Sequence, residues 1–151
     1  MALDLRTQVP RSPFDELEGF PWLARLIDKA RAEFAGTSGE YSAYPCPGDR
    51  GFLKAFGVDH GPLGELIKSG ADDAAIAAWI TANARDGSAD AKAAYRKTLM
   101  GPHGNPIFAA FAKWLAFKSR ASLAQRGIPW MSLDSIPKAL AAEEGHPVPD
   151  R

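Results

Sequence analysis

The sequence predicts an all-α, single-domain helical bundle of about six to seven helices with an extended N-terminal arm over residues 1–12. Apolar residues recur at spacings of three and four along most of the 151 residues, which is the period of a helix with one buried face. No segment alternates apolar and polar residues with an excess of β-branched side chains, so we expect no sheet. A chain of this length is typical of one domain, and residues 146–151 are expected to fray.

Residues that favour helix starts and ends define the helices expected before Gly101. Serine, aspartate and proline mark the starts, and glycine marks the ends. A short helical turn is expected from Ser12 to Leu17. The longer helices are expected over Pro21–Ala35, Asp49–Phe56, Pro62–Ser69, a segment beginning at Asp72, and Ser88–Leu99.

The helix beginning at Pro21 has two unlike faces. Its apolar residues recur at helical spacing and predict a buried face: Trp22, Leu23, Leu26, Ile27, Ala30 and Phe34. The charged residues are expected to line its solvent-exposed side: Arg25, Asp28, Lys29 and Arg31. Because Asp28 and Arg31 are three residues apart, we expect them to form an exposed ion pair.

The longest helix is expected from Asn105 to Arg126. Its apolar residues wrap most of the helix, which is typical of an element at the centre of a bundle. They are Ile107, Phe108, Phe111, Trp114, Leu115 and Phe117. We therefore expect the aromatic rings to pack in the core rather than to stack on nucleic-acid bases. An extended segment over 128–133 and a short helix from Ser135 to Gly145 complete the chain.

The charged residues are unevenly distributed along a neutral chain. The 18 Lys and Arg residues balance the 18 Asp and Glu residues, yet residues 91–133 hold seven Lys and Arg and no Asp or Glu. This basic segment either pairs with the acidic N-terminal half or forms a surface that attracts anions. A nucleic-acid accessory protein is therefore a second alternative function. Nucleic acid is disfavoured as a partner, because a neutral protein lacks the long-range attraction typical of nucleic-acid binders.

The sequence predicts a cytoplasmic protein with no membrane segment. A single cysteine, Cys46, forms no internal disulfide. No stretch approaches the ~20 apolar residues that a membrane-spanning helix needs. The start, Met1–Arg6, carries an acid where a secretory signal has only positive charge.

Cys46 is the leading candidate for chemistry. It lies between two prolines that restrict the backbone, just before the helix expected at Asp49. A sulfur at a helix N-terminus faces unpaired N–H groups that favour the reactive thiolate. Three arginines would add positive charge if the fold brings them close: Arg11, Arg31 and Arg50. A thiol-dependent enzyme using Cys46 is therefore an alternative function, and a packed, inert sulfur is the other interpretation.

The leading functional prediction is a binding module with a polar pocket around the Cys46 loop. The side chains expected to meet there offer both donors and acceptors, which suits a small polar or anionic ligand. They are Arg11, Asp28, Arg31, Glu40, Tyr41, Tyr44, Cys46 and Asp49. A protein partner and a buried network that only anchors the arm both stay open.

Neither a cofactor nor a metal site is expected. His60, His103 and His146 are isolated, and none has a second histidine or cysteine three or four residues away. The turn at 36–39 lacks the Lys-Ser/Thr ending and the preceding strand of a phosphate-binding loop.

Several short strings, in order, resemble a bacterial family of small proteins classed as a domain of unknown function. They are Leu5-Arg6-Thr7, Pro10-Arg11-Ser12-Pro13, Ile27-Asp28-Lys29-Ala30-Arg31, Gly39-Glu40-Tyr41, Cys46-Pro47 with Asp49, Asp72 to Trp79, and Trp130 with Leu133 and Asp134. The resemblance covers most of the chain. It implies a single intracellular domain and names no reaction.

Overall fold

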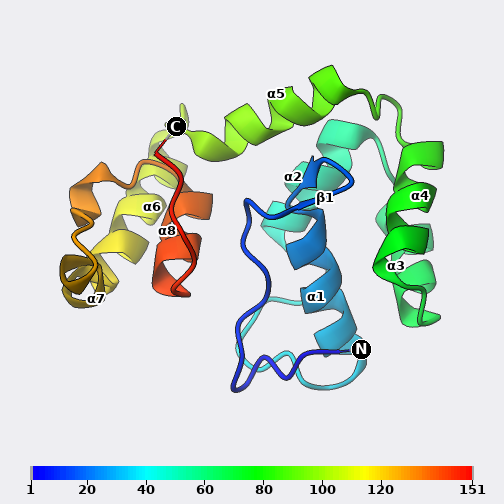
Figure 1. Cartoon of the computed structure of the whole chain (residues 1–151), viewed down its shortest axis with the longest axis horizontal. Coiled ribbons are helices and arrows are strands. Elements are labelled where there is room, and N and C mark those ends of the chain that lie inside the picture. The colour runs from blue at the N-terminus through cyan, green and yellow to red at the C-terminus, as the bar shows by residue number, and fades with distance from the viewer. Residues whose placement is uncertain (1, 151) are drawn as a thin grey trace. The chain divides into compact units, whose positions relative to one another are not determined.

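The computed structural model describes residues 2–150 and confirms that the protein is mostly helical (Figure 1). The chain forms two compact units, the first ending at Ala93 and the second beginning at Ala94. The helices of the described residues are α1 (Leu23–Phe34), α2 (Pro47–Phe56), α3 (His60–Lys68), α4 (Asp73–Asn83), α5 (Ala89–Met100), α6 (Pro106–Lys118), α7 (Arg120–Gln125), the 3-10 helix η1 (Trp130–Ser132) and α8 (Ile136–Glu143). Residues 2–12 contain no helix or strand, but they are not extended throughout, because the N–H of Gln8 donates to the carbonyl oxygen of Asp4 at 2.8 Å in a turn.

A short hairpin replaces the helical turn expected before α1. Strands β1 (Glu16–Leu17) and β2 (Phe20–Pro21) pair antiparallel in a two-stranded sheet. The two residues between them, Glu18 and Gly19, have φ of 51° and 81°. Two consecutive left-handed residues make the tight turn that joins antiparallel strands. Glutamate gives no sequence signal for that conformation, so the pattern of residues does not predict the hairpin.

The charged side of α1 is buried, which corrects the expectation that it faces solvent. Arg25, Asp28 and Lys29 all lie in the interior of the first unit. Irregular segments cover this side of the helix: the arm reaches Asp28 through Arg11, and the loop before α2 reaches Lys29 through Cys46. Helical periodicity predicts the face that meets other helices, but it carries no information about loops that fold back over the opposite face.

The two ends of α1 also differ from the expectation. The helix begins at Leu23 instead of Pro21, because Trp22 has φ of 72°, a left-handed conformation that does not belong to a right-handed helix. Phe34, expected on the buried face, is exposed in the last turn.

Three aromatic rings form the centre of the first unit. Phe20 from the hairpin meets Phe56 of α2 with ring centroids 5.0 Å apart, and Phe52 meets Phe56 at 4.9 Å. Edge-to-face and tilted contacts of this kind are favourable arrangements for aromatic pairs. Aliphatic side chains from α1, α3 and α4 complete the buried core: Leu23, Leu26, Ile27, Leu63, Ile76 and Ile80. Phe52 and Phe56 of α2 are both buried in this core.

The second unit packs α6 against α8, α7 and η1. Its core consists of Leu115, Ala116, Leu123, Leu133, Ala139 and Ala142. The single long helix expected from Asn105 to Arg126 is divided at Ser119, where φ of −97° and ψ of 10° interrupt the helical path. The division gives α7 a new direction, and its Leu123 is fully buried in the same core.

One side of α6 is exposed, which corrects the expectation that this helix is buried all round. Of its six large apolar residues, Leu115 lies in the core, whereas Ile107 is 75% exposed and Trp114 is 53% exposed. Helices α7, α8 and η1 are short and pack against one side of α6. The aromatic residues on the other side are surface residues in the second unit. Within residues 2–150, no helix has the combination of length and apolar content needed to cross a membrane.

We predict that Leu123→Ala destabilises the second unit by about 2–5 kcal/mol, because it leaves a cavity in a well-packed core. The matched substitution Ile107→Ala removes a side chain from the surface and should change the free energy of unfolding by no more than about 0.5 kcal/mol. Urea denaturation followed by far-ultraviolet circular dichroism measures both values. Equal losses for the two variants would show that α6 is buried on both sides.

Candidate functional site

Cys46 lies at the start of α2, as the sequence predicts. Its Sγ accepts a hydrogen bond from the backbone N–H of Asp49 at 3.5 Å, and the Asp49 carboxylate accepts one from the backbone N–H of Cys46 at 3.0 Å. This reciprocal arrangement is a capping box, which satisfies two of the N–H groups left unpaired at a helix N-terminus. Pro47 occupies the first helical position, where its missing N–H costs nothing.

The cation next to the sulfur is Lys29. Its Nζ donates to the Cys46 Sγ at 3.0 Å, and both side chains are buried, each with 6% of its surface exposed. The Asp49 carboxylate also accepts a hydrogen bond from the indole Nε1 of Trp22 at 2.9 Å. Trp22, Lys29, Cys46 and Asp49 therefore form one buried polar cluster between α1 and the start of α2. Arg50, one of the three arginines expected to add positive charge near the thiol, is exposed.

The backbone of α2 approaches the indole of this cluster very closely. A Cβ atom built on Gly48 would lie 2.3 Å from the Trp22 ring. No side chain larger than hydrogen fits at this position unless the ring moves. The close approach fixes the indole over the first turn of α2 and directs its Nε1 toward Asp49.

A second group of charged residues joins the arm, α1 and α4. Arg11 donates to Asp28 through Nε and Nη2, both at 3.0 Å, and to Asp73 through Nη1 at 2.9 Å. Arg31 donates to Asp73 at 2.9 Å and to the carbonyl oxygen of Ala71 at 2.9 Å. The sequence predicts Arg11, Asp28 and Arg31 in one site. Arg11 contacts Asp28 directly and is linked to Arg31 through Asp73. The expected exposed pair between Asp28 and Arg31 is replaced by partners on other segments.

The residue that links this ionic cluster, Asp73, is not among the predicted site residues. It is the first residue of α4, where an acidic side chain interacts favourably with the helix dipole. The sequence alone therefore gives no reason to assign Asp73 to a site. Burial tends to raise the pKa of Asp73, but the hydrogen bonds and charges of Arg11 and Arg31 outweigh it and lower the pKa below its usual value. The pKa of Arg11 is raised, since Asp28 and Asp73 more than offset the effect of its partial burial.

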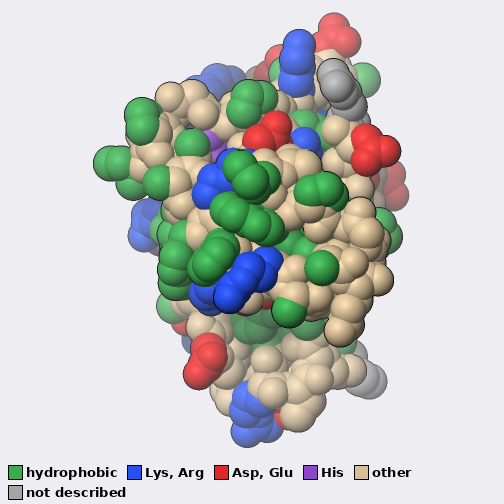
Figure 2. Space-filling view, turned by 90° about the vertical axis from the view of Figure 1, so that its left-hand side faces the viewer, with side chains coloured by type: hydrophobic (Ala, Val, Ile, Leu, Met, Phe, Trp, Pro, Cys, Tyr) green, Lys and Arg blue, Asp and Glu red, His purple; other side chains and the backbone are tan. Residues whose placement is uncertain are grey.

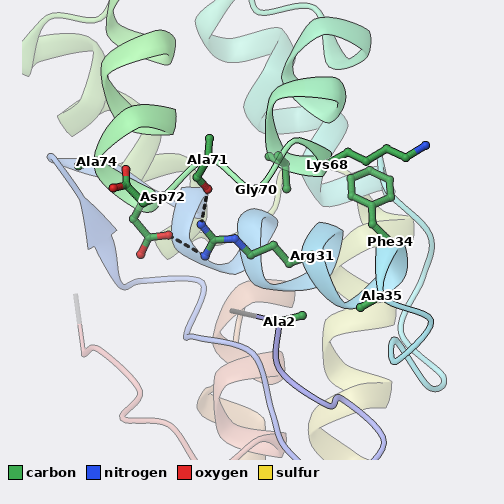
Figure 3. A pocket seen from close by; sticks show the side chains of 11 residues that line it. Ala2, Arg31, Phe34, Ala35, Lys68, Gly70, Ala71, Asp72 and Ala74 are labelled. Atoms are coloured by element: carbon green, nitrogen blue, oxygen red, sulfur yellow. Dashed lines mark hydrogen bonds and ion pairs between the residues drawn. The ribbon is translucent and has the colours of Figure 1, made fainter.

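A pocket of about 680 Å³ opens beside the ionic cluster (Figure 3). Its charged lining comes from Arg31, Lys68, Asp72 and Asp73, and its apolar or small lining from Ala2, Phe34, Ala35, Ile67, Gly70, Ala71 and Ala74. Figure 3 places Asp72 and Lys68 on opposite sides of the pocket, with the guanidinium of Arg31 between them. Asp72 also caps α4 by accepting from the backbone N–H of Ala75 at 2.8 Å.

The other predicted site residues do not line this pocket, although the Tyr44 ring packs against Phe34, which does, with ring centroids 6.4 Å apart. The Tyr44 hydroxyl donates to the carbonyl oxygen of His60 at 2.7 Å, and burial, with the charges of Asp49 and Asp59, raises its pKa. Tyr41 lies beside Arg25, whose guanidinium carbon is 5.9 Å from the ring centroid. Glu40 is exposed. The eight predicted residues therefore divide between the ionic cluster, the cluster around Cys46, and the loop surface.

Comparison with known protein families identifies one match. The model of the family described as "Domain of unknown function (DUF5069)" matches residues 7–144. The chain belongs to the DUF5069 family. This confirms the resemblance inferred from the short strings, nearly all of which lie inside the matched range. No curated protein sequence matches this DUF5069 chain.

For this DUF5069 protein we predict that Asp49→Ala lowers the free energy of unfolding by about 2–4 kcal/mol, because two buried donors, the indole of Trp22 and the N–H of Cys46, lose their acceptor. Asp59→Ala is the matched control, since Asp59 caps α3 at an exposed site, and it should cost about 1 kcal/mol. Thermal and urea denaturation measure both. An equal cost for the two variants would contradict the importance of the buried cluster.

We also predict that the stabilising effect of Asp73 depends on pH. Its pKa is lower in the folded chain than in the unfolded chain, so its contribution is complete above the unfolded value near 4 and is lost as the pH falls through the folded value. The stability difference between the wild type and Asp73→Asn should be constant from about pH 7 to 5 and shrink below about pH 4. Urea denaturation at each pH measures this difference, and a difference that grows on acidification would contradict the ion-pair assignment.

Proposed function

We propose that this protein is a binding module whose pocket between α1, α3 and α4 holds a small polar ligand that carries both an anionic and a cationic group. The observation that carries the proposal is the mixed lining of that pocket, with Lys68 and Asp72 on opposite sides. Phe34, Ala35 and Ile67 add apolar surface to the lining. Ligand sites commonly combine mainly apolar walls with a few placed polar groups.

The charges in the pocket suit a zwitterion such as a small amino acid. Arg31 and Asp73 pair with each other, and Asp73 also pairs with Arg11, so they form a rigid wall rather than flexible ligand-binding groups. Lys68 is exposed. Its ammonium points away from the pocket in Figure 3, and its flexible side chain has to turn inward to reach an anionic group. Asp72 uses one carboxylate oxygen for the helix cap, which leaves the second oxygen to accept from a cationic group.

The thiol-dependent alternative has less support. A catalytic thiolate has to reach its substrate, whereas Sγ of Cys46 is buried and is held by Lys29 and by the N–H of Asp49. These contacts are those of a packed side chain at a helix start. The proposed site therefore differs from the predicted pocket around the Cys46 loop. It is the pocket walled by Arg31 and Asp73, and of its lining residues only Arg31 belongs to the predicted set.

We predict that at least one member of a panel of free amino acids and related small zwitterions stabilises the protein in a thermal-shift assay. A ligand present at about 100 times its Kd adds ~2.7 kcal/mol of stability, which is several degrees for a protein of this size. Ala74→Leu should abolish the shift, because the larger side chain occupies the pocket. Ala78→Leu, which is exposed one turn further along α4, should leave it unchanged.

Two results would contradict this proposal. One is that no compound in the panel raises the melting temperature of the wild type. The other is that a stabilising compound acts equally on Ala74→Leu and Ala78→Leu, which would place its site elsewhere.

A further inference from the structure

The exposed side of α6 carries a straight stripe of large side chains. Ile107, Phe111, Trp114 and Lys118 follow one another at spacings of four, three and four residues, which aligns them along one face of a helix. The first three are exposed, and the rings of Phe111 and Trp114 stack with centroids 5.7 Å apart. Figure 2 shows hydrophobic side chains gathered on this side of the molecule, with Lys and Arg among them.

Further exposed apolar residues lie on α6 and on η1 beside it. We call this surface the α6 face, and it consists of Ile107, Phe108, Phe111, Trp114, Phe117 and Met131. Isolated exposed apolar residues are normal on a protein surface, but a contiguous group of this kind marks an interaction site. Tryptophan, phenylalanine and methionine are also the residues enriched at the centres of protein interfaces.

The border of the α6 face is basic. The Lys118 ammonium lies 4.4 Å from the Trp114 ring centroid, and the Arg120 guanidinium carbon lies 4.0 Å from that of Phe117. Lys113 donates to the carbonyl oxygen of Met131 at another border. These residues belong to the segment 91–133, which contains no Asp or Glu. Any partner that covers the apolar centre therefore meets positive charge at its edges.

We propose that the α6 face binds an amphipathic α-helix of a partner protein, with apolar residues against the stripe and Asp or Glu along its edges. Two helices pack by fitting the side-chain ridges of one into the grooves of the other, and a stripe with this spacing presents such a ridge. The stripe extends along most of α6, which at 13 residues is about 20 Å long and matches a partner helix of three to four turns. Acidic edges pair with Lys113, Lys118 and Arg120 and fix the partner's orientation.

Nucleic acid fits this surface less well. Single-stranded nucleic acid binds by stacking bases on open ring faces, but Lys118 and Arg120 each lie over one face of the ring that they contact. Phe111 and Trp114 also cover each other. Ile107 is the most exposed apolar member of the α6 face, and an aliphatic side chain offers no ring on which a base can stack.

A second copy of the chain and an anionic membrane are also disfavoured by charge. Self-association through the α6 face would bring two basic borders together, which is repulsive. An anionic bilayer would approach the carboxylate of Glu143, which lies 3.9 Å from Lys118 at the border of the surface. A discrete helix carries fewer acidic groups than a bilayer surface, and it can place them beside Lys113 and Arg120 rather than beside the pair of Lys118 and Glu143.

The first experiment selects partners from a displayed library of helical peptides with randomised surface positions. The bait is the full chain, and the counter-selection uses the double variant Ile107→Glu/Phe111→Glu. We expect enriched peptides to carry apolar residues at helical spacing and an excess of Asp and Glu on either side. Failure to enrich any peptide, or enrichment of neutral or basic peptides, would overturn the proposal.

The second experiment measures the Kd of the enriched peptide by fluorescence anisotropy. Ile107→Glu/Phe111→Glu and Lys118→Glu/Arg120→Glu should each raise the Kd by about tenfold or more, since the first removes apolar contact and the second reverses the charge of the border. Arg50→Glu/Lys54→Glu, an equal charge change on exposed residues of α2, should leave the Kd within about twofold. Circular dichroism confirms that every variant is folded.

The same variants decide between the rival occupants. Concentration-dependent dimerisation in sedimentation that Ile107→Glu/Phe111→Glu abolishes would assign the surface to a second copy. Binding to phosphatidylserine vesicles, or to a single-stranded oligonucleotide, that the stripe variant abolishes while the peptide fails to bind would assign it to a membrane or to nucleic acid. Each of these results would overturn the proposal.

Discussion

The buried carboxylate of Asp28 is the constraint on which the arrangement of the first unit depends. An ionised carboxylate in the interior is unstable without a charged partner, so α1 adopts its buried position only if a cation accompanies it. Arg11 supplies this cation from an arm that has no regular secondary structure, and its remaining donor reaches Asp73. The arm is thereby fixed along α1, and the first residue of α4 is fixed to both. The pocket beside Asp73 exists because these three segments meet.

The elements that the sequence predicts well are those defined by local signals. Asp72 caps α4, Ser88 caps α5 and Ser135 caps α8, each by accepting a hydrogen bond from a backbone N–H within the first turn. Left-handed Gly57 ends α2. A capping residue is satisfied by neighbours three residues away, so its effect is independent of the rest of the fold. Most helix bounds lie within two residues of the expected ones for this reason.

The elements that the sequence predicts poorly depend on contacts between distant segments. The periodicity of α1 assigns Lys29 to solvent, but the loop around Cys46 covers it, and no local pattern announces that loop. For α6 the sequence predicts burial where the structure shows exposure. A helix that is apolar all round is expected at a centre, but the second unit is too small to surround it. Burial is thus a property of how much chain is available to cover a helix.

The same distinction explains the candidate site. The sequence predicts a group formed by Arg11, Asp28 and Arg31, because charged residues near one helix need partners of opposite charge. Asp73 is not predicted, because an acidic residue at a helix start is already expected from the helix dipole. The sequence signal that identifies Asp73 is the presence of two adjacent aspartates at 72–73, since one aspartate suffices to cap the helix. Lys29 has a similar signal, since α1 has more charged residues than one exposed helix side accommodates.

The close packing of Gly48 under Trp22 has an evolutionary consequence. Pro47 starts a helix, Gly48 leaves room for a ring, and Asp49 accepts two buried hydrogen bonds, so three adjacent positions are each restricted for a different mechanical reason. Cys46 caps the same helix start, so selection for folding alone would retain the whole string Cys-Pro-Gly-Asp among descendants of this chain. A cysteine inside an invariant tetrapeptide resembles the signature of a catalytic nucleophile. In this protein such invariance would reflect the packing of α1 against the start of α2, and it would not indicate where a ligand binds.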